Sequence, residues 1–420
     1  MTMAADPLAR PMLSVEDARA QMLDGLTPLA VEQVALADGL RRVVADSIVS
    51  TITLPPWDNS AMDGFAVRSA DLAEPAPLRV IGEVAAGAAP SVTVEVGTAV
   101  RILTGAPIPS GSDAVVPVED TDAAPGVAAL PAIVVIRTAV AAGAHIRRAG
   151  SDLRAGQRIL DPGTELTPAA LAGAAAGGHA TLPVHGRPRV AVLATGDELV
   201  AAGAELGAAQ IPDSNTPGLL AAARDAGAET RSLGIARDTF ESVRAALLEG
   251  LAWADAIVAS GGVSVGAHDI VKDAFASVGR IDLWRIAVQP GKPLAFGRAP
   301  AAGRAGEVLL FGLPGNPVSS LVTFELFVRP VLRRLAGHAD VLGRETITAT
   351  LSDSVRKAPG RRAFIRVRLE HDGASWRASL AGGQESHMLS ALAAADGLAI
   401  IPETIDSVAA GTTVEVLRLR

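Results

Sequence analysis

The second half of the chain alternates short apolar runs with segments of helical spacing. Four apolar runs, at 189–195, 229–238, 254–260 and 307–317, each lead into a segment with the periodicity of an amphipathic helix. Strands that are apolar on both faces and alternate with helices are typical of a parallel sheet covered by helices on both sides. The pattern therefore predicts a doubly wound, mostly parallel α/β domain.

The rest of the chain follows a two-residue rhythm. Residues 51–140 form short alternating runs separated by turn-rich stretches such as PPWDNSAMDG and TGAPIPSGSD, which predicts a small inserted antiparallel β domain. Residues 344–420 alternate in the same way and predict a small β barrel or sandwich. Residues 14–25 predict a helix, with Ser14 as its N-cap and Gly25 as its C-cap.

These patterns divide the chain into four domains. We expect an elongated N-terminal domain from 1–50 plus 141–186, an inserted β domain at 51–140, the α/β domain at 187–335 and a C-terminal β domain at 336–420. Residues about 11–30 could instead pack on the α/β domain. A chain of 420 residues is too long for a single core, in agreement with this division.

Composition argues against several classes of function. The net charge of −8 argues against nucleic acid as a partner, since nucleic-acid binders present a basic face. The absence of cysteine excludes disulfides, thiol nucleophiles and iron–sulfur clusters. The N-terminus lacks the apolar core of a signal peptide, and the most apolar window, 168–178, is too short to cross a membrane. We therefore expect a cytoplasmic protein that acts away from membranes.

The unusual polar residues follow the predicted parallel strands. In an open parallel sheet, the loops at the carboxyl ends of the strands form the ligand crevice. The candidate residues in these loops are Thr195, Gly196, Asp197 and Glu198 after the first strand, Asp238 after the second, Gly261, Gly262, Ser264, Gly266 and Asp269 after the third, and Pro314, Gly315, Asn316 and Pro317 after the fourth.

Three carboxylates at one sheet edge favour a metal. Glu198, Asp238 and Asp269 could each cap the helix that follows, which is the simpler reading of any one of them. The glycine-rich loop could be only a tight turn, but its three glycines around Ser264 favour an anion site. Two like charges about 4 Å apart repel by about 4 kcal/mol at an effective dielectric of 20. A carboxylate cluster beside phosphate therefore favours a bridging Mg²⁺.

A lysine adds positive charge beside this cluster. Only three of the 37 basic residues are lysines, and one of them, Lys292, stands between Pro290 and Pro293. We interpret Lys292 as an oxyanion contact, with an incidental surface lysine as the alternative. The Pro314–Pro317 turn precedes a helix and could form a second anion site or a stiff structural turn.

Together these motifs resemble one enzyme family. DNSAMDGFAV, RILTGAPIPSGSDAVVPVED, VLATGDEL, SGGVSVGAHD, QPGKPLAFG and GLPGNPVSS, in this order, resemble the molybdopterin molybdenumtransferases, which are related to the E domain of gephyrin. The resemblance implies Mg²⁺-dependent conversion of adenylylated molybdopterin and molybdate into molybdenum cofactor and AMP. It also implies a homodimer whose active site lies between the α/β domain of one subunit and the inserted β domain of the other.

The resemblance also assigns residues and partners. The positions that match the family's functional residues are Asp63, Thr104, Asp152, Glu198, Asp238, Asp269, Lys292, Pro314, Pro317, Arg366 and Ser386. Phe65, Gln289 and Glu385 depart from the family pattern, and Glu385 weakens the assignment of Ser386. Molybdopterin adenylyltransferase and molybdoenzyme-maturation proteins are the implied partners. Adenylylation of molybdopterin itself and a gephyrin-like scaffold role are the alternative functions.

Overall fold

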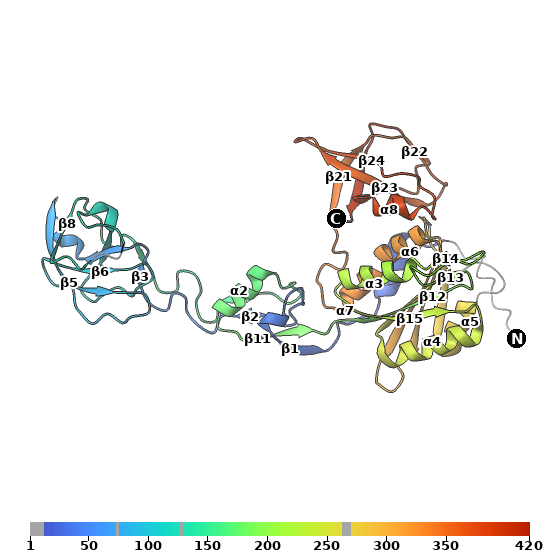
Figure 1. Ribbon diagram of the computed structural model, residues 1–420, viewed down its shortest axis with the longest axis horizontal. Helices are drawn as coiled ribbons and strands as arrows, with labels where there is room; N and C mark the ends of the chain where they lie inside the picture. Colours follow the sequence, from blue (N-terminus) through green and yellow to red (C-terminus); the bar gives the residue numbers. More distant parts are fainter. Residues whose placement is uncertain (1–11, 73–74, 127–128, 263–269) are drawn as a thin grey trace.

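The computed structural model describes residues 12–72, 75–126, 129–262 and 270–420. Figure 1 shows an elongated chain with a β-rich lobe at one end and an α/β region with a barrel beside it at the other. A narrow connection, formed by two stretches of the chain, joins the two ends. We call these parts the distal lobe (59–147), the linker (29–58 with 148–186), the α/β region (187–335) and the C-terminal barrel (344–420).

The α/β region is built on a six-stranded sheet. Its strands lie in the order β15 (Glu229–Ala236), β12 (Arg189–Thr195), β16 (Ala256–Ser260), β20 (Glu307–Leu313), β19 (Pro293–Pro300) and β17 (Arg280–Arg285). The first four are parallel, which confirms the predicted mostly parallel sheet. β19 and β17 run antiparallel at one edge, a hairpin that the periodicity did not predict.

Helices cover both faces of this sheet. The helices on one face are α3 (Asn215–Asp225), α6 (Pro317–Thr323), a π-helical turn η5 (Phe324–Val328) and α7 (Arg329–Leu335); those on the other face are α4 (Phe240–Trp253) and α5 (Ile270–Val278). The first face also receives α1 (Val15–Leu23) through its buried residues Val15, Ala18 and Met22. As predicted, Ser14 caps α1, since its hydroxyl accepts a hydrogen bond from the Asp17 N–H.

The linker is formed by two separate stretches of the chain. The antiparallel pairs β1 (Val31–Ala35) with β11 (Thr181–His185) and β2 (Ile48–Val49) with β10 (Arg158–Leu160) run side by side. They enclose a small apolar core with α2 (Pro168–Ala176), whose N-cap is Thr167. Through these pairings, the stretch that runs towards the distal lobe lies beside the stretch that runs back from it (Figure 1).

The distal lobe holds a five-stranded sheet. Its order is β7 (Ala114–Pro117), β4 (Gly64–Val67), β6 (Thr98–Ile102), β5 (Ala76–Val84) and β8 (Ile133–Ile136). All neighbouring pairs are antiparallel except β5 with β6, so the predicted antiparallel sheet contains one parallel pair. The short pair β3 (Asn59–Ser60) and β9 (Ile146–Arg147) closes its base, and the 3₁₀ turns Ser69–Asp71 and Val118–Asp120 flank it.

The C-terminal strands close into a barrel. The order is β23 (Arg362–His371), β24 (Trp376–Leu380), β21 (Thr346–Leu351), β27 (Thr413–Arg418) and β25 (Gly397–Ile401), and β25 pairs back with β23. A short pair, β22 (Val355–Arg356) and β26 (Ser407–Val408), and the helix α8 (Leu389–Ala393) complete it. Of the two predicted alternatives, barrel or sandwich, the chain forms the barrel.

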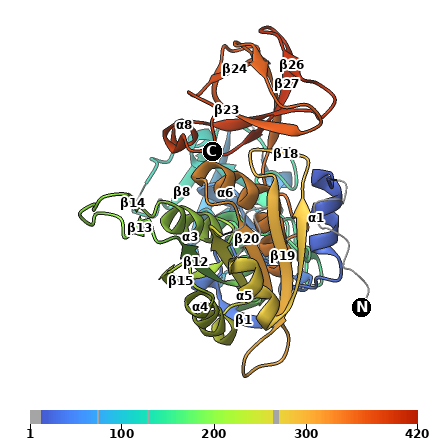
Figure 2. The ribbon, with the colours of Figure 1, turned by 90° about the vertical axis from the view of Figure 1, so that its right-hand side faces the viewer.

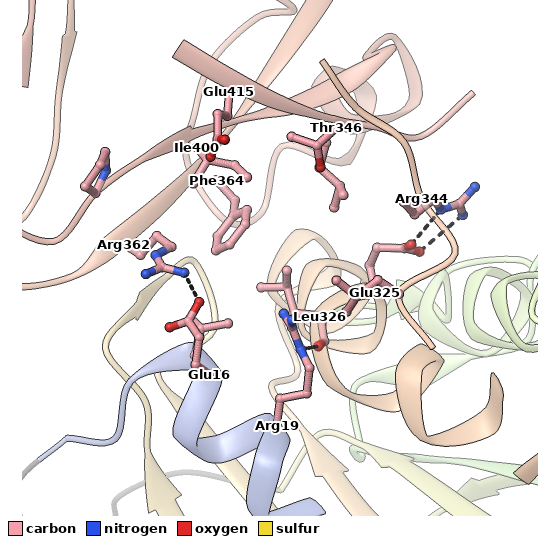
Figure 3. A pocket seen from close by; sticks show the side chains of 14 residues that line it. Glu16, Arg19, Glu325, Leu326, Arg344, Thr346, Arg362, Phe364, Ile400 and Glu415 are labelled. Carbon is pink, nitrogen blue, oxygen red and sulfur yellow. Dashed lines mark hydrogen bonds and ion pairs between the residues drawn. The ribbon is translucent and has the colours of Figure 1, made fainter. Parts of the chain in front are cut away.

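The barrel contacts the α/β region and α1 at several places. β18 (Val288–Gln289), which leaves β17, pairs with β23 of the barrel, and Figure 2 shows α6 beneath the barrel beside α8. On the other side a cavity of about 390 Å³ lies between α1, η5 and the barrel strands (Figure 3). Arg362 of the barrel pairs with Glu16 of α1 there, and Arg344 pairs with Glu325 at 2.6 Å.

In the part of the chain that the structure describes, every helix is too short or too polar to cross a lipid bilayer.

Candidate active site

A cavity of about 830 Å³ opens at the carboxyl edge of β12, β16 and β20, where the sequence predicted the ligand crevice. Its polar and glycine lining comes from seven separate segments. The lining includes Thr195, Gly196, Glu198, Asp213, Asn215, Asp238, Ser260, Gly261, Gly262, Lys292, Pro314, Gly315, Asn316, Pro317, Ser319 and His387. Residues separated by up to 192 positions thus meet around one space, which makes this cavity the candidate active site.

One side of the cavity is acidic. Glu198 follows β12, Asp238 follows β15, and the backbone N–H of Asp238 donates to Asp197 Oδ1 at 3.2 Å. Partial burial, together with the negative charges of Asp197 and Glu198, raises the pKa of Asp238. The three carboxylates therefore repel one another, and a cation among them would relieve that repulsion.

The glycines after β16 are required by close packing. Gly261 has φ +97, and a Cβ on it would lie 2.5 Å from the carbonyl oxygen of Thr195. A side chain at Gly262, with φ +63, would collide with Val271. The N–H of Gly261 donates to the Leu313 carbonyl at 3.3 Å, so this glycine shapes the cavity and its own N–H is already used. Ser264, Gly266 and Asp269 lie outside the described residues.

The turn before α6 brings the barrel to the cavity. Pro317 occupies the first turn of α6, where its missing N–H costs no helical hydrogen bond. The side-chain amide of Asn316 donates to Ser386 Oγ at 2.8 Å, and the Val318 N–H donates to the Ser386 carbonyl at 3.2 Å. The predicted residues Asn316 and Ser386 therefore lie in contact, although they belong to different regions of the chain.

Lys292 lies at the basic side of the cavity. It follows the cis Gln289–Pro290 bond and precedes β19, opposite Arg285 of β17, which pairs with Pro293. Repulsion from Arg285, partial burial and repulsion from Arg361 lower the pKa of Lys292. Positive charges from the α/β region and from the barrel thus converge beside the cavity, and an anion would be attracted there.

Arg366 acts inside the barrel. Its side chain is completely buried, and Nη2 donates to the carbonyl oxygens of Gly383 at 2.7 Å and Glu385 at 3.2 Å. Burial lowers the pKa of Arg366, and the charge of Glu385 partly offsets this. Arg366 is not among the residues that line the cavity, so in this structure it holds the segment that presents Ser386.

Comparison with known proteins assigns the chain to a family. Residues 13–178 match the MoeA N-terminal region (domain I and II), residues 191–334 match a probable molybdopterin binding domain, and residues 348–419 match the MoeA C-terminal region (domain IV). Molybdopterin molybdenumtransferase 2 of Mycobacterium tuberculosis is 42% identical over 408 residues, which are 94% of this chain and 96% of that protein. The chain belongs to the molybdopterin molybdenumtransferase family.

Other members support the same assignment. The molybdopterin molybdenumtransferase of Haemophilus influenzae is 35% identical and covers 96% of this chain and 98% of its own. A solved structure of a molybdopterin biosynthesis MoeA protein from Pyrococcus horikoshii aligns with a TM-score of 0.79 and 32% identity over 98% of this chain and all of that one. The resemblance inferred from the motifs is thereby confirmed, as is the mixed α/β fold with its terminal barrel.

Three of the family positions lie away from the cavity of their own chain. Asp63 and Thr104 are in the distal lobe, at the opposite end of the molecule from β12 and β15 (Figure 1). Asp63 accepts a 2.6 Å hydrogen bond from the Thr104 N–H, and this bond and one with the Thr104 side chain hold the pKa of Asp63 below its usual range. Asp152 is exposed in the linker, where its N–H donates to the Leu54 carbonyl at 3.1 Å.

Some cavity residues were missed by sequence reasoning. Asp213 is buried and accepts hydrogen bonds at 3.0 Å from the N–H groups of Asn215 and Thr216, which fixes the start of α3. Ser260 ends β16, and His387 follows Ser386 in the barrel. A polar Asp–Ser–Asn run directly before a helix was the available signal for α3. No periodicity in the sequence places His387 beside the α/β region.

Proposed function

We propose that this protein transfers molybdenum from molybdate to adenylylated molybdopterin, and releases AMP and molybdenum cofactor. The observation that carries the proposal is one cavity with carboxylates on one side and Lys292 on the other, in a chain whose relatives bear the name molybdopterin molybdenumtransferase. Such a cavity can hold a phosphate through a metal and an oxyanion through a cation at the same time.

The carboxylate side fits Mg²⁺. Among the residues with described positions, no set of three or more His, Asp or Glu side chains is arranged to hold a metal ion alone. Mg²⁺ commonly uses one or two carboxylates together with substrate phosphates, and Glu198 and Asp238 both line the cavity. We assign these two as ligands, with Asp269 as the third expected from the sequence. Bound Mg²⁺ would neutralise charge on the phosphate of the leaving AMP.

The other residues would bind and orient. Lys292 would hold molybdate, because a compact ammonium near other cations attracts a dianion. The Pro314–Pro317 turn would present the N–H groups of Gly315 and Asn316, since its prolines have none, and Ser386, held by Asn316, would close the cavity from the barrel side. Water would add across the phosphoanhydride bond, so that AMP leaves with one phosphate and the molybdopterin keeps the other.

The active site would be shared between two subunits. Asp63 and Thr104 lie at the far end of their own chain, and Asp63 faces a hollow of about 310 Å³ with Phe65 and Arg101. In a homodimer with two-fold symmetry, the distal lobe of one subunit can approach the cavity of the other. Coexpressed D63N and E198Q chains should then recover about a quarter of wild-type activity, because half of the dimers are mixed and one of their two sites is intact.

The central test is the dependence of AMP release on molybdate. The purified protein, given adenylylated molybdopterin and Mg²⁺, should release AMP when molybdate is added and release much less without it. Consumption of ATP with free molybdopterin, with AMP release indifferent to molybdate, would assign the adenylyltransferase activity instead. Full complementation of a molybdoenzyme-deficient strain by E198A and D238A variants would support a scaffold role and contradict catalysis at this cavity.

A further inference from the structure

The C-terminal barrel contributes a histidine to the candidate active site. His387 lines the cavity and its side chain is exposed. The other residues that line the cavity belong to the α/β region. Among the residues that the structure describes, none forms a hydrogen bond or an ion pair with the imidazole of His387. Both ring nitrogens can therefore bind a ligand that enters the cavity.

The backbone on both sides of His387 is held in place. Before it, Ser386 accepts two hydrogen bonds, one from the Val318 N–H to its carbonyl at 3.2 Å and one from the Asn316 amide to its Oγ at 2.8 Å. After it, the Leu389 N–H donates to the His387 carbonyl at 2.9 Å, where α8 begins. Figure 2 shows α8 beside α6. The loop therefore presents His387 next to the first turn of α6.

Lys292 lies beside the same turn of α6. A Cβ on Gly291 would lie 3.5 Å from the carbonyl oxygen of Ser319, which is the neighbour of Val318 in the first turn of α6. Lys292 and His387 therefore each follow a residue that contacts this turn, and both line the cavity. A compact oxyanion bound at this turn can contact both side chains.

The charges in this region favour a group that can change its own charge. Repulsion from Arg285 and Arg361 already lowers the pKa of Lys292, so a further permanent cation would add to the repulsion while the site is empty. A histidine can be neutral in the empty site and gain a proton when an anion arrives. The first turn of α6 has no ionisable side chain. The remaining ionisable groups are carboxylates, namely Glu198, Asp213 and Asp238 on the cavity wall and Glu385 in the barrel loop.

We propose that His387 binds the molybdate dianion together with Lys292, and that its imidazole takes up a proton when the anion binds. This inference rests on the proposed function, in which molybdate is the oxyanion that enters the cavity. The protonated ring donates a hydrogen bond to one molybdate oxygen, and Lys292 contacts another. A binding step that takes up one proton loses about tenfold in affinity per pH unit as the pH rises.

Isothermal titration calorimetry with sodium molybdate tests the inference on the full-length protein with Mg²⁺ and AMP. Titrations at one pH, in buffers that differ in ionisation enthalpy, give the number of protons taken up for each molybdate bound. Wild type should take up about one proton at pH 7.5, and its affinity should fall about five- to tenfold between pH 7 and pH 8.

Variants then identify the group that takes up the proton. H387Q keeps a hydrogen-bond donor but cannot titrate. It should bind molybdate about tenfold more weakly than wild type at pH 7, as expected for one hydrogen bond to a charged group, and should take up no proton. K292M should also bind more weakly but keep the proton uptake. H371Q is the matched control, since His371 is an exposed histidine of the same barrel that does not line the cavity. It should equal wild type in affinity and in proton uptake.

The outcomes separate the inference from the proposed function. If wild type binds molybdate without proton uptake, or if H387Q takes up as many protons as wild type, the inference is overturned and the proposed function stands. Proton uptake that persists in H387Q and disappears in K292M would assign the titration to Lys292 and overturn the inference in the same way. If wild type binds no molybdate, both the inference and the proposed function are overturned.

Discussion

Asn316 donates a 2.8 Å hydrogen bond from its side-chain amide to Ser386 Oγ, and so joins the turn before α6 to the barrel at the edge of the cavity. The two residues are 70 positions apart, and nothing in the sequence around either of them indicates this contact. The bond shows that the barrel is part of the site. Activity should therefore depend on how the barrel is held as well as on the α/β region.

Removing this bond should reduce activity more than stability. In S386A the hydroxyl that accepts from Asn316 is lost, while the backbone bond from Val318 to residue 386 remains. We expect the free energy of unfolding to fall by about 1 kcal/mol and kcat/KM for molybdate to fall about tenfold. S390A, an exposed serine on α8, is the control. Equal kinetics for S386A, S390A and wild type would contradict the role assigned to Ser386.

Replacing Arg366 should affect both stability and activity. In R366M the carbonyl groups of Gly383 and Glu385 lose their charged donor, and each hydrogen bond to a charged group is worth about 1.5–3 kcal/mol. We expect a loss of about 2–4 kcal/mol in urea unfolding and a lower kcat/KM, because residues 383–386 are no longer held. R366K should recover part of this, since lysine keeps the charge without the planar fork. R368M, at an exposed position of the same strand, should behave as wild type.

The α/β fold was predictable because its signal is local. Each of the strands β12, β15, β16 and β20 is followed by a helix, and apolar periodicity reveals both. The hairpin of β17 and β19 was not predicted. Residues Gln289–Pro293, where the chain passes from β17 into β19, contain two prolines and a lysine, and this composition predicts a turn. The barrel and the parallel pair in the distal lobe depend on which strands meet, and alternation carries no information about that.

Only the part of the site formed by the loops of the α/β region was predictable from the pattern of strands and helices. Carboxyl ends of parallel strands must share an edge, so Glu198, Asp238 and the glycines could be grouped by their positions after the predicted strands. Ser386 and Arg366 were found through family motifs, yet nothing in the sequence shows that Arg366 is buried and acts through a loop. Asn215 and His387 were missed, because their importance arises from contacts between distant segments.

His338 should make stability depend on pH. Burial, together with Arg333 and Arg329, lowers the pKa of His338 to about 4, so at neutral pH it is uncharged and makes no ion pair with Glu165, 3.7 Å away. As pH falls from about 6.5 to about 4, the unfolded chain takes up a proton that the folded chain refuses, and stability is lost. Since one pKa unit is worth about 1.4 kcal/mol, the total is about 3 kcal/mol.

The H338Q variant tests this directly. Its unfolding free energy should fall less than that of wild type between pH 7.5 and pH 4.5, as measured by urea denaturation at several pH values. His387, which is exposed, supplies the matched control, and H387Q should keep the wild-type pH dependence of stability. A constant difference between wild type and H338Q across this range would show that His338 does not contribute to the pH dependence.

Asp238 should change the pH dependence of stability in the opposite direction to His338. Its effect on stability should also depend on Mg²⁺. Its raised pKa means that the ionised form is disfavoured in the folded chain, so without Mg²⁺ its charge destabilises the protein above that pKa and the penalty disappears as pH falls through it. D238N should therefore be more stable than wild type at pH 7.5 in metal-free buffer, and the gain should vanish in acid. The exposed Asp282 on β17 provides the control D282N.

Addition of Mg²⁺ with AMP should reverse this order. At one hundred times the dissociation constant, a ligand that binds only the folded state adds about 2.7 kcal/mol, and wild type should gain this stability in thermal unfolding. D238N should gain much less, because one of the two carboxylates assigned as Mg²⁺ ligands is gone. D282N should follow wild type. If Mg²⁺ and AMP stabilise D238N and wild type equally, Asp238 is not a metal ligand, and a bound cation does not relieve its repulsion from Asp197 and Glu198.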